Sequence, residues 1–146
     1  MCREFGATQI LNRHTSSQEE TWEIIMSLTH GRGVDVGIEA AGSLSAVMDG
    51  MSLVRTGGTY ISAGFGEPAG SVEFPWFENV IRKNLTVQGV WVSDTRHVLE
   101  AMRLVQMNYE KFASMITHRF RLEDATAALE SVHSRQAVKA VLIPCS

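Results

Sequence analysis

Segments with strand character and segments with helix character alternate along this chain from about residue 8 to residue 107. Compact apolar runs over 34–39, 59–64 and 85–92 have the length of buried strands, and apolar residues recur at helical spacing between them. Strands separated by helices pair in parallel, because a right-handed helical crossover brings the next strand back in the same direction. The alternation therefore predicts an α/β fold built on a doubly wound parallel sheet.

The predicted helices are marked by residues that favour helix ends. A side-chain oxygen at the N-cap satisfies a free backbone N–H, proline suits the first turn, and glycine suits the residue after the last turn. By these signals, residues 1–7 are the end of a helix that Gly6 terminates. Further helices are predicted to start at Ser16 or Ser17, at Gly42–Ser43, at Pro75, at Asp94 or Thr95, and at Leu122.

The remaining segments are predicted as strands, turns and loops. Residues 55–58 are expected to form a turn, because glycine adopts the positive φ that other residues avoid. Two glycines and a proline predict a loop over 65–71. Besides the apolar runs named above, short strands are predicted over 8–11, 116–120 and 138–143.

Composition excludes several classes of function. The 146 residues suffice for one ordinary domain, and a net charge of −3 provides no basic surface for nucleic acid or an anionic membrane. No apolar run approaches the roughly 20 residues of a membrane span, and no leader pattern opens the chain, so we expect a cytoplasmic protein. Cys2 and Cys145 are expected to be free thiols, with a disulfide between them as the alternative.

Six segments, taken together, resemble one known family. They are REFGA (3–7), GRGVDVGIEAAG (31–42), RTGGTYISAGF (55–65), LTVQGVWV (85–92), ITHRFRLEDATAALE (116–130) and KAVLIP (139–144). Each segment alone is common, but their order and spacing are similar to the second half of the zinc-dependent medium-chain alcohol dehydrogenases. The resemblance covers nearly the whole chain, and it implies an oxidoreductase that moves a hydride between an alcohol or aldehyde and NAD(P).

The resemblance implies an incomplete Rossmann-like domain. The family's nucleotide-binding domain has six parallel strands in the order 3-2-1-4-5-6, and the predicted strands from 8–11 to 85–92 match strands three to six. Strands one and two have no counterpart, and neither has the G-x-G-x-x-G turn that binds the pyrophosphate. We therefore assign 1–107 to a partial dinucleotide-binding domain and 108–146 to a segment that in the family returns to the catalytic domain.

The family's zinc site lies in a catalytic domain that has no counterpart here. Zinc is held there by cysteine, histidine and carboxylate ligands, and a lone histidine is more often a structural or surface residue. The histidines of this chain are scattered singly: His14, His30, His97, His118 and His133. We expect no metal site and no catalytic residue, and weak or absent dinucleotide binding by the chain alone.

Some cofactor contacts of the family can still be assigned by position, because its nicotinamide lies where the fifth and sixth strands end. Ala63 and Val90 match carbonyls that accept from the carboxamide, and Val92 matches an N–H that donates to it. Gly64 and Phe65 match residues beside the nicotinamide ribose. The other matches are Ala40, Ala41 and Gly42, which line the cofactor groove, and Lys139, which reaches the pyrophosphate.

Each of these residues also has a plain structural interpretation. Alanine and valine are ordinary at strand ends, the two glycines suit turns, and Lys139 is a candidate for simple solvation. Glu39 lies at the end of an apolar strand, where it could reach a ribose, but we expect a surface carboxylate.

The missing strands predict exposed edges. Without its neighbours, the strand over 34–39 has an unpaired apolar edge, and such edges pair with other chains. We expect either direct pairing of 8–11 with 34–39 or oligomerisation. The family's sixth strand also pairs with its mate across a two-fold axis, so a homodimer through 85–92 is the default expectation.

The sequence leaves three functions open. The chain is part of a dehydrogenase of this family, or a non-catalytic dimerising α/β module, or a subunit that a separate chain with the zinc domain complements. The missing cofactor and metal residues favour a chain without catalytic activity in isolation. The substrate and the choice between NAD and NADP depend on residues that the chain does not contain.

Overall fold

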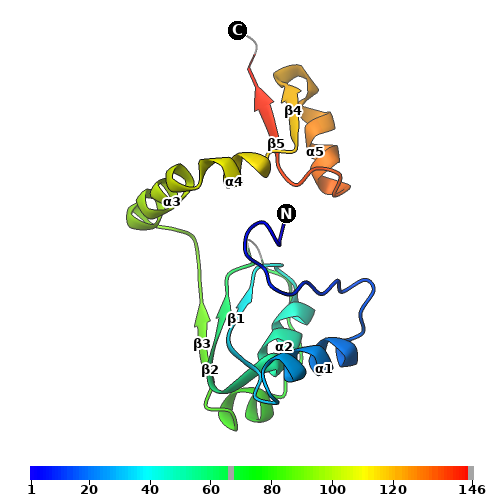
Figure 1. The fold of residues 1–146 in the computed structure, drawn as a ribbon, viewed down its shortest axis with the longest axis vertical. Coiled ribbons are helices and arrows are strands. Elements are labelled where there is room, and N and C mark those ends of the chain that lie inside the picture. Colours follow the sequence, from blue (N-terminus) through cyan, green and yellow to red (C-terminus); the bar gives the residue numbers. More distant parts are fainter. Residues whose placement is uncertain (66–67, 145–146) are drawn as a thin grey trace. The chain divides into compact units, whose positions relative to one another are not determined.

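The computed structural model describes residues 1–65 and 68–144, and its chain forms two compact units (Figure 1). One unit is Leu11–Val92, and the other combines Met1–Ile10 with the described residues from Ser93 onward. None of the helices in the described residues is long and apolar enough to cross a membrane.

The unit Leu11–Val92 is built on a three-stranded parallel sheet. Its strands are β1 (Val34–Glu39), β2 (Val54–Ser62) and β3 (Thr86–Gly89), and they lie in the order β1-β2-β3 (Figure 1). The parallel pairing and the helical connections confirm the predicted α/β class. They also match the family order, in which strands four, five and six are neighbours.

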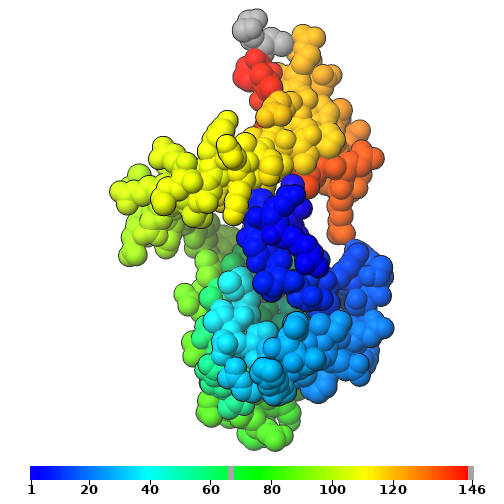
Figure 2. Space-filling view, in the orientation of Figure 1, coloured from blue at the N-terminus to red at the C-terminus, as the bar shows by residue number. Residues whose placement is uncertain are grey.

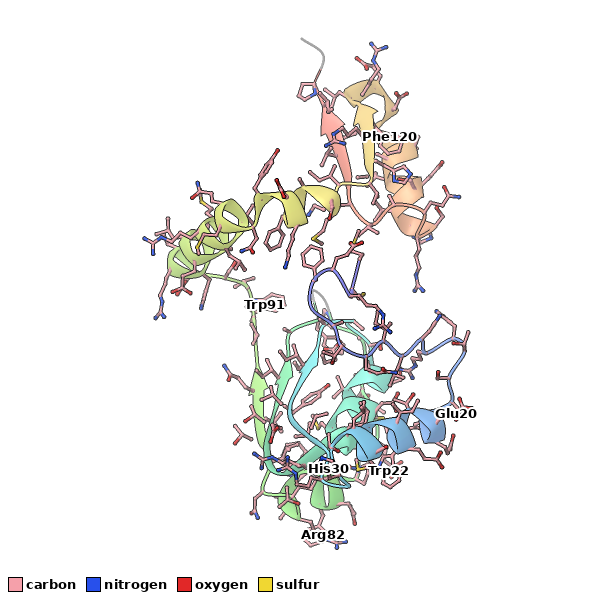
Figure 3. The ribbon with its side chains drawn as sticks, viewed as in Figure 1. Glu20, Trp22, His30, Arg82, Trp91 and Phe120 are labelled. Carbon is pink, nitrogen blue, oxygen red and sulfur yellow. The ribbon has the colours of Figure 1, made fainter. Side chains whose placement is uncertain are left out.

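Two helical segments connect these strands: α2 (Leu44–Leu53) lies between β1 and β2, and the short π-helix η1 (Phe77–Ile81) between β2 and β3. A further helix, α1 (Gln18–Leu28), precedes β1. The predicted cap of α1 is confirmed, since Ser17 Oγ accepts from the Glu20 N–H at 3.1 Å. The Glu20 carboxylate in turn accepts from the Ser17 N–H at 2.9 Å, which completes a capping box. In Figure 3, Glu20 and Trp22 lie on this helix, and Trp22 is half exposed.

The core of this unit lies between α2 and the sheet. Its buried apolar residues are Met51, Val54, Tyr60 and Val80, with Phe74 among the partly buried neighbours. A Cβ atom at Gly37 would lie 3.2 Å from the Tyr60 ring, so β1 can pack closely against Tyr60 only with glycine there. Burial, together with the negative charges of Glu39 and Asp49, raises the pKa of Tyr60 to about 12.

The Lys83 side chain binds the carbonyl groups at the C-terminal end of α2. Its ammonium donates to the carbonyls of Met51, Ser52 and Val54 at 3.1, 2.7 and 2.9 Å. The last carbonyls of a helix have no partner within the helix, and they form its negative end. A cation at this position therefore donates hydrogen bonds to those carbonyls and also offsets the negative charge. Burial lowers the pKa of Lys83.

The strand β2 begins earlier than predicted, and the predicted turn over 55–58 is wrong. Val34 pairs with Val54, whereas Val36 already pairs with Thr59, so this stretch bulges from the ladder. Gly57, at φ +69°, donates its N–H to the Lys83 carbonyl at 2.7 Å, and this bond holds the bulge in place.

The predicted helix end over 1–7 and strand over 8–11 are also wrong. Residues 2–6 form hydrogen-bonded turns, which end where Gly6 adopts the expected positive φ of +102°. Residues 8–11 form no strand, and β1 is an edge of its sheet. The predicted direct pairing of these two segments is therefore absent from the structure. A strand needs a hydrogen-bonded neighbour, and strand two, which would lie beside 8–11 in the family, has no counterpart here.

The second unit contains a parallel strand pair with a helix as its crossover. Strands β4 (His118–Arg121) and β5 (Ala140–Ile143) pair with each other, and α5 (Ala125–His133) packs on both (Figure 1). A single 3-10 turn, η2 (Leu122–Asp124), leads into α5. The two predicted short strands and the helix between them are thus present, with shifted bounds.

Two further helices precede this pair. The helix α3 (Thr95–Met107) has the predicted N-cap Asp94, whose Oδ1 accepts from the His97 N–H at 2.9 Å. The short helix α4 (Tyr109–Ser114) was not predicted. The Phe112 ring of α4 makes an edge contact with Phe5, at 5.8 Å between ring centroids.

Two predictions fall partly or wholly outside the described residues. Cys2 is an exposed free thiol, whereas its predicted alternative partner Cys145 is not described. The predicted loop 65–71 includes residues 66–67, which are also not described, and the rest of it has no regular secondary structure.

Candidate functional site

The turns that follow β1 and β2 are joined by the carboxylate of Glu39, the last residue of β1. Glu39 Oε1 accepts from the N–H groups of Ala41 and Gly42, at 2.6 and 2.5 Å. Its Oε2 accepts from the Gly64 N–H and from the Ser62 hydroxyl, both at 3.3 Å. Glu39 is only 5% exposed, so the expectation of a surface carboxylate is wrong.

Hydrogen bonds keep this buried carboxyl ionised. Burial by itself would raise the pKa of Glu39, because a charge loses its hydration inside a protein. The N–H groups of Gly42, Ala41 and Gly64 and the Ser62 hydroxyl outweigh that effect and hold the pKa below its ordinary value. The carboxylate thus remains charged at neutral pH while its described partners are backbone N–H groups and one hydroxyl.

Glycine permits the close approach of the two turns. Gly42 has φ +68°, a conformation that L-residues rarely adopt. A Cβ atom at Gly64 would come within 2.7 Å of the Ala41 nitrogen, so a larger residue would force the turns apart. The site is therefore defined by one carboxylate and two glycines at neighbouring strand ends.

Six of the predicted cofactor-binding residues lie in these two turns. Among them, the three alanines are exposed and the other three residues are partly buried. The backbone of the turn after β2 is tied to β1 by a further bond, from the Ala63 N–H to the Glu39 carbonyl at 2.9 Å. The six residues are Ala40, Ala41, Gly42, Ala63, Gly64 and Phe65.

Two more predicted residues lie just beyond β3, beside the end of β2. The Val90 N–H donates to the Ser62 carbonyl at 2.9 Å, which extends the ladder past the strand. Val92 is 73% exposed and has φ +47°, which is unusual for a β-branched residue. Between them, Trp91 is 69% exposed (Figure 3).

The ninth predicted residue, Lys139, belongs to the other unit and is not part of this group. Its carbonyl accepts from the N–H groups of Thr117 and His118, at 3.1 and 3.3 Å, next to the start of β5. Its side chain is exposed.

The eight predicted residues that follow β1, β2 and β3 are called the grouped residues below. Their chemistry suits an uncharged, hydrogen-bonding ligand. The segments 39–43, 62–65 and 90–92 contain no cationic side chain, so they offer no counter-charge to a phosphate. They offer backbone N–H and carbonyl groups at the carboxyl ends of three parallel strands, which is where ligands bind in open α/β sheets.

The described residues do not fit a zinc ion. No group of three or more histidine, cysteine, aspartate or glutamate side chains comes together within residues 1–65 and 68–144. A protein zinc site needs at least three such ligands, so we derive no zinc-dependent step from this chain.

Next to the site, the edge of β1 borders an open apolar cavity of about 350 Å³. Its lining includes Val36 and Ile38, which are 53% and 67% exposed, and the site residues Glu39, Ala40 and Ala41. Figure 2 shows atoms of β1, in cyan, at the surface of this unit.

Sequence and structure comparisons identify the family. The sequence pattern of the family described as zinc-binding dehydrogenase matches residues 1–107. The chain belongs to this family. The recognition made from the six sequence segments is thereby confirmed, and the family is NAD(P)- and zinc-dependent.

Curated relatives of this chain include 5-exo-hydroxycamphor dehydrogenase of Pseudomonas putida and L-threonine 3-dehydrogenase of Bacillus subtilis. Both are 29% identical to it, over 97% and 99% of the chain and 40% of each relative. Among solved structures, an alcohol dehydrogenase from Thermotoga maritima is 42% identical, with a TM-score of 0.92 over 98% of this chain and 39% of that one. The chain thus spans about 40% of the length of the dehydrogenases it matches, and it corresponds to their C-terminal part.

The residue that sequence reasoning missed is Glu39. A usable signal is present in the sequence, because Glu39 ends an apolar strand and is followed by two small residues and a glycine. A short turn of that kind directs N–H groups back toward the preceding side chain. The contacts with Ser62 and Gly64 have no such local signal, since they come from a strand more than 20 residues later.

Proposed function

We propose that this chain supplies the nicotinamide side of the dinucleotide site in a zinc-type dehydrogenase that acts on an alcohol or aldehyde. The observation that carries the proposal is the Glu39-linked pair of turns at the carboxyl ends of β1 and β2. From the family resemblance, we assign Ala40, Ala41 and Gly42 to the cofactor groove, and to the positions around the nicotinamide and its ribose Ala63, Gly64, Phe65, Val90 and Val92. Lys139 is proposed as a pyrophosphate contact from the family match alone.

The proposed role of the chain is to orient the cofactor through backbone groups. NAD(P), when bound, supplies the hydride acceptor or donor. The carbonyls of Ala63 and Val90 would accept from the carboxamide, and the Val92 N–H would donate to it. These groups would fix which face of the ring meets the substrate, and this orienting effect is a large part of how dehydrogenases work.

We expect the chain alone to bind the dinucleotide weakly and to lack catalytic activity. The glycine-rich turn that binds pyrophosphate in the family has no counterpart in the sequence, and the grouped segments contain no cation. We further propose that residues 1–107 act as a partial dinucleotide-binding domain and that 108–146 belongs with a catalytic domain. That catalytic domain would supply the zinc, either in the same polypeptide or in a separate chain.

We propose a homodimer through β3 and the residues around it as the default assembly. All four β3 residues are exposed, and no strand within the described part of the chain pairs with its outer edge. Exposed apolar residues follow directly at Val90, Trp91 and Val92. The unpaired edge of β1 is the alternative surface.

Titration with parts of the cofactor tests the proposed site. We expect NADH and reduced nicotinamide mononucleotide to bind the purified chain with similar, roughly millimolar affinity, because only the nicotinamide side is present. AMP should not bind. Tight binding of AMP, or no binding of either nicotinamide compound, would contradict the proposal.

A pair of variants locates the binding. Ala63→Phe places a ring over the exposed end of β2 and should abolish binding of reduced nicotinamide mononucleotide. Ala127→Phe makes the same change at an exposed position of α5 in the other unit and should leave binding unchanged. Equal affinities for the two variants would show that the nucleotide binds elsewhere.

A further inference from the structure

The hydrogen bonds of Glu39 connect two segments that are far apart in sequence. One carboxylate oxygen holds the turn at Ala41 and Gly42, and the other holds Gly64 and Ser62 from the next strand. The separation between the two turns is therefore set by the width of one carboxylate group. Besides Glu39, the one side chain that contributes to this link among the hydrogen bonds of the described residues is the Ser62 hydroxyl.

Stability alone does not account for a carboxylate at this position. A buried charge costs free energy when it leaves water, and at Glu39 four hydrogen bonds from neutral groups offset that cost. The Ala63 N–H already bonds the Glu39 carbonyl, so the strands are paired at this level without the side chain. The side-chain bonds serve the turns beyond the strands, which carry six of the proposed cofactor contacts.

We infer that Glu39 is a positioning residue for the nicotinamide site. Through its four hydrogen bonds it sets the distance between the turn at 40–42 and the turn at 63–65. It does not contact the ligand, because both of its oxygens are occupied by protein donors. The inference rests on the proposed function for its ligand, but the hydrogen bonds can be tested without any ligand.

The substitution Glu39→Gln tests the role of the second oxygen. A glutamine Oε1 can still accept from Ala41 and Gly42, but its Nε2 is a donor and faces the N–H of Gly64. The bond between the turns is lost, whereas the size of the side chain is kept. Glu23→Gln on the exposed side of α1 is the matched control.

Two measurements on the full chain separate positioning from stability. In amide hydrogen exchange, Glu39→Gln should speed exchange at Gly64 by about tenfold and leave the core amide of Tyr60 unchanged. At a temperature where both proteins are folded, its affinity for reduced nicotinamide mononucleotide should fall by about tenfold or more. Glu23→Gln should match the wild type in both measurements.

The possible outcomes are distinct. Unchanged exchange at Gly64 in Glu39→Gln overturns the inference. Faster exchange at Gly64 with unchanged nucleotide affinity also overturns it, because the turns would then not position the ligand. If the wild type binds no nicotinamide nucleotide, the proposed function fails, and the exchange result still decides whether Glu39 holds the turns. If Glu39→Gln does not fold, Ser62→Ala can be used instead, because it removes a single hydrogen-bond donor. It should speed exchange at Gly64 and weaken nucleotide binding by smaller factors.

Discussion

Gly42 and Gly64 face each other so closely that a Cβ atom on Gly42 would lie 2.6 Å from the carbonyl oxygen of Gly64. Two turns from different strands thus meet backbone to backbone, with no side chain between them. This contact leaves the N–H groups of both turns directed at one carboxylate. The geometry of the site depends on the absence of two side chains as much as on the presence of Glu39.

Gly64→Ala should destabilise the fold by about 1–3 kcal/mol, because its Cβ would collide with the backbone at Ala41 and the turns would have to separate. Gly89→Ala, at a position where a Cβ atom meets nothing within 4 Å, should change the free energy of unfolding by less than about 0.5 kcal/mol. Urea denaturation monitored by tryptophan fluorescence measures both. Equal effects of the two substitutions would show that the turns tolerate separation.

The stability of the fold should fall in acid because of Glu39. Its folded-state pKa is below the ordinary value, so the carboxylate stabilises the fold above an unfolded pKa of about 4.3. That stabilisation is lost as the pH falls through the folded pKa. We expect the free energy of unfolding of the wild type to decline from roughly pH 5 downward, and Glu39→Gln to decline less.

The comparison between the two proteins is needed because other carboxyls titrate in the same range. Hydrogen bonding and charge from Arg55 lower the pKa of Asp35, and the His97 N–H lowers that of Asp94. Both groups remain in the variant, so the difference between the two curves isolates Glu39. Parallel curves from pH 6 to pH 3 would refute its contribution.

Lys83→Met should cost about 2 kcal/mol of stability, because three carbonyls at the end of α2 would lose their cationic partner. Arg82, the preceding residue, is exposed, and its side chain points away from the fold in Figure 3. Arg82→Met should therefore have little effect. Thermal unfolding of the two variants gives the comparison, and similar melting temperatures would mean that water replaces the ammonium without loss.

The proposed dimer predicts a difference between the two sheet edges. Val87→Lys on β3 should shift the mass toward the monomer, because charged side chains on an edge strand oppose pairing with another chain. Ile38→Lys on β1 should leave the dimer intact. Light scattering over a range of concentrations measures both. Dissociation by Ile38→Lys alone would move the interface to β1, and a wild-type monomer at all concentrations would exclude the dimer.

Local sequence signals were sufficient for much of the fold. The bounds of β1 and the caps Ser17 and Asp94 were predicted correctly, because an apolar run and an oxygen-bearing cap act through neighbouring residues. The segment 8–11 has strand character but forms no strand, since pairing depends on a neighbour that the chain does not contain. The extent of β2 was missed for a related reason. Its bulge is held by a hydrogen bond from the Gly57 N–H to the Lys83 carbonyl, which lies far along the chain.

The candidate site was predictable only in part. The family resemblance pointed to the residues after β1, β2 and β3, and eight of the nine lie in one unit. The role of Glu39 required the fold, because its link to Gly64 joins positions that no local pattern connects. A buried carboxylate and a solvated one look alike in sequence.

The spacing of paired strands has a consequence for how the chain reaches its structure. Val34 pairs with Val54, Thr59 with Thr86 and His118 with Ala140. Strand partners are thus only about 20 to 27 positions apart, so each ladder closes over one helical connection and little loop entropy is lost at a time. The sheets can assemble one crossover after another, which makes rapid refolding from denaturant the expected behaviour.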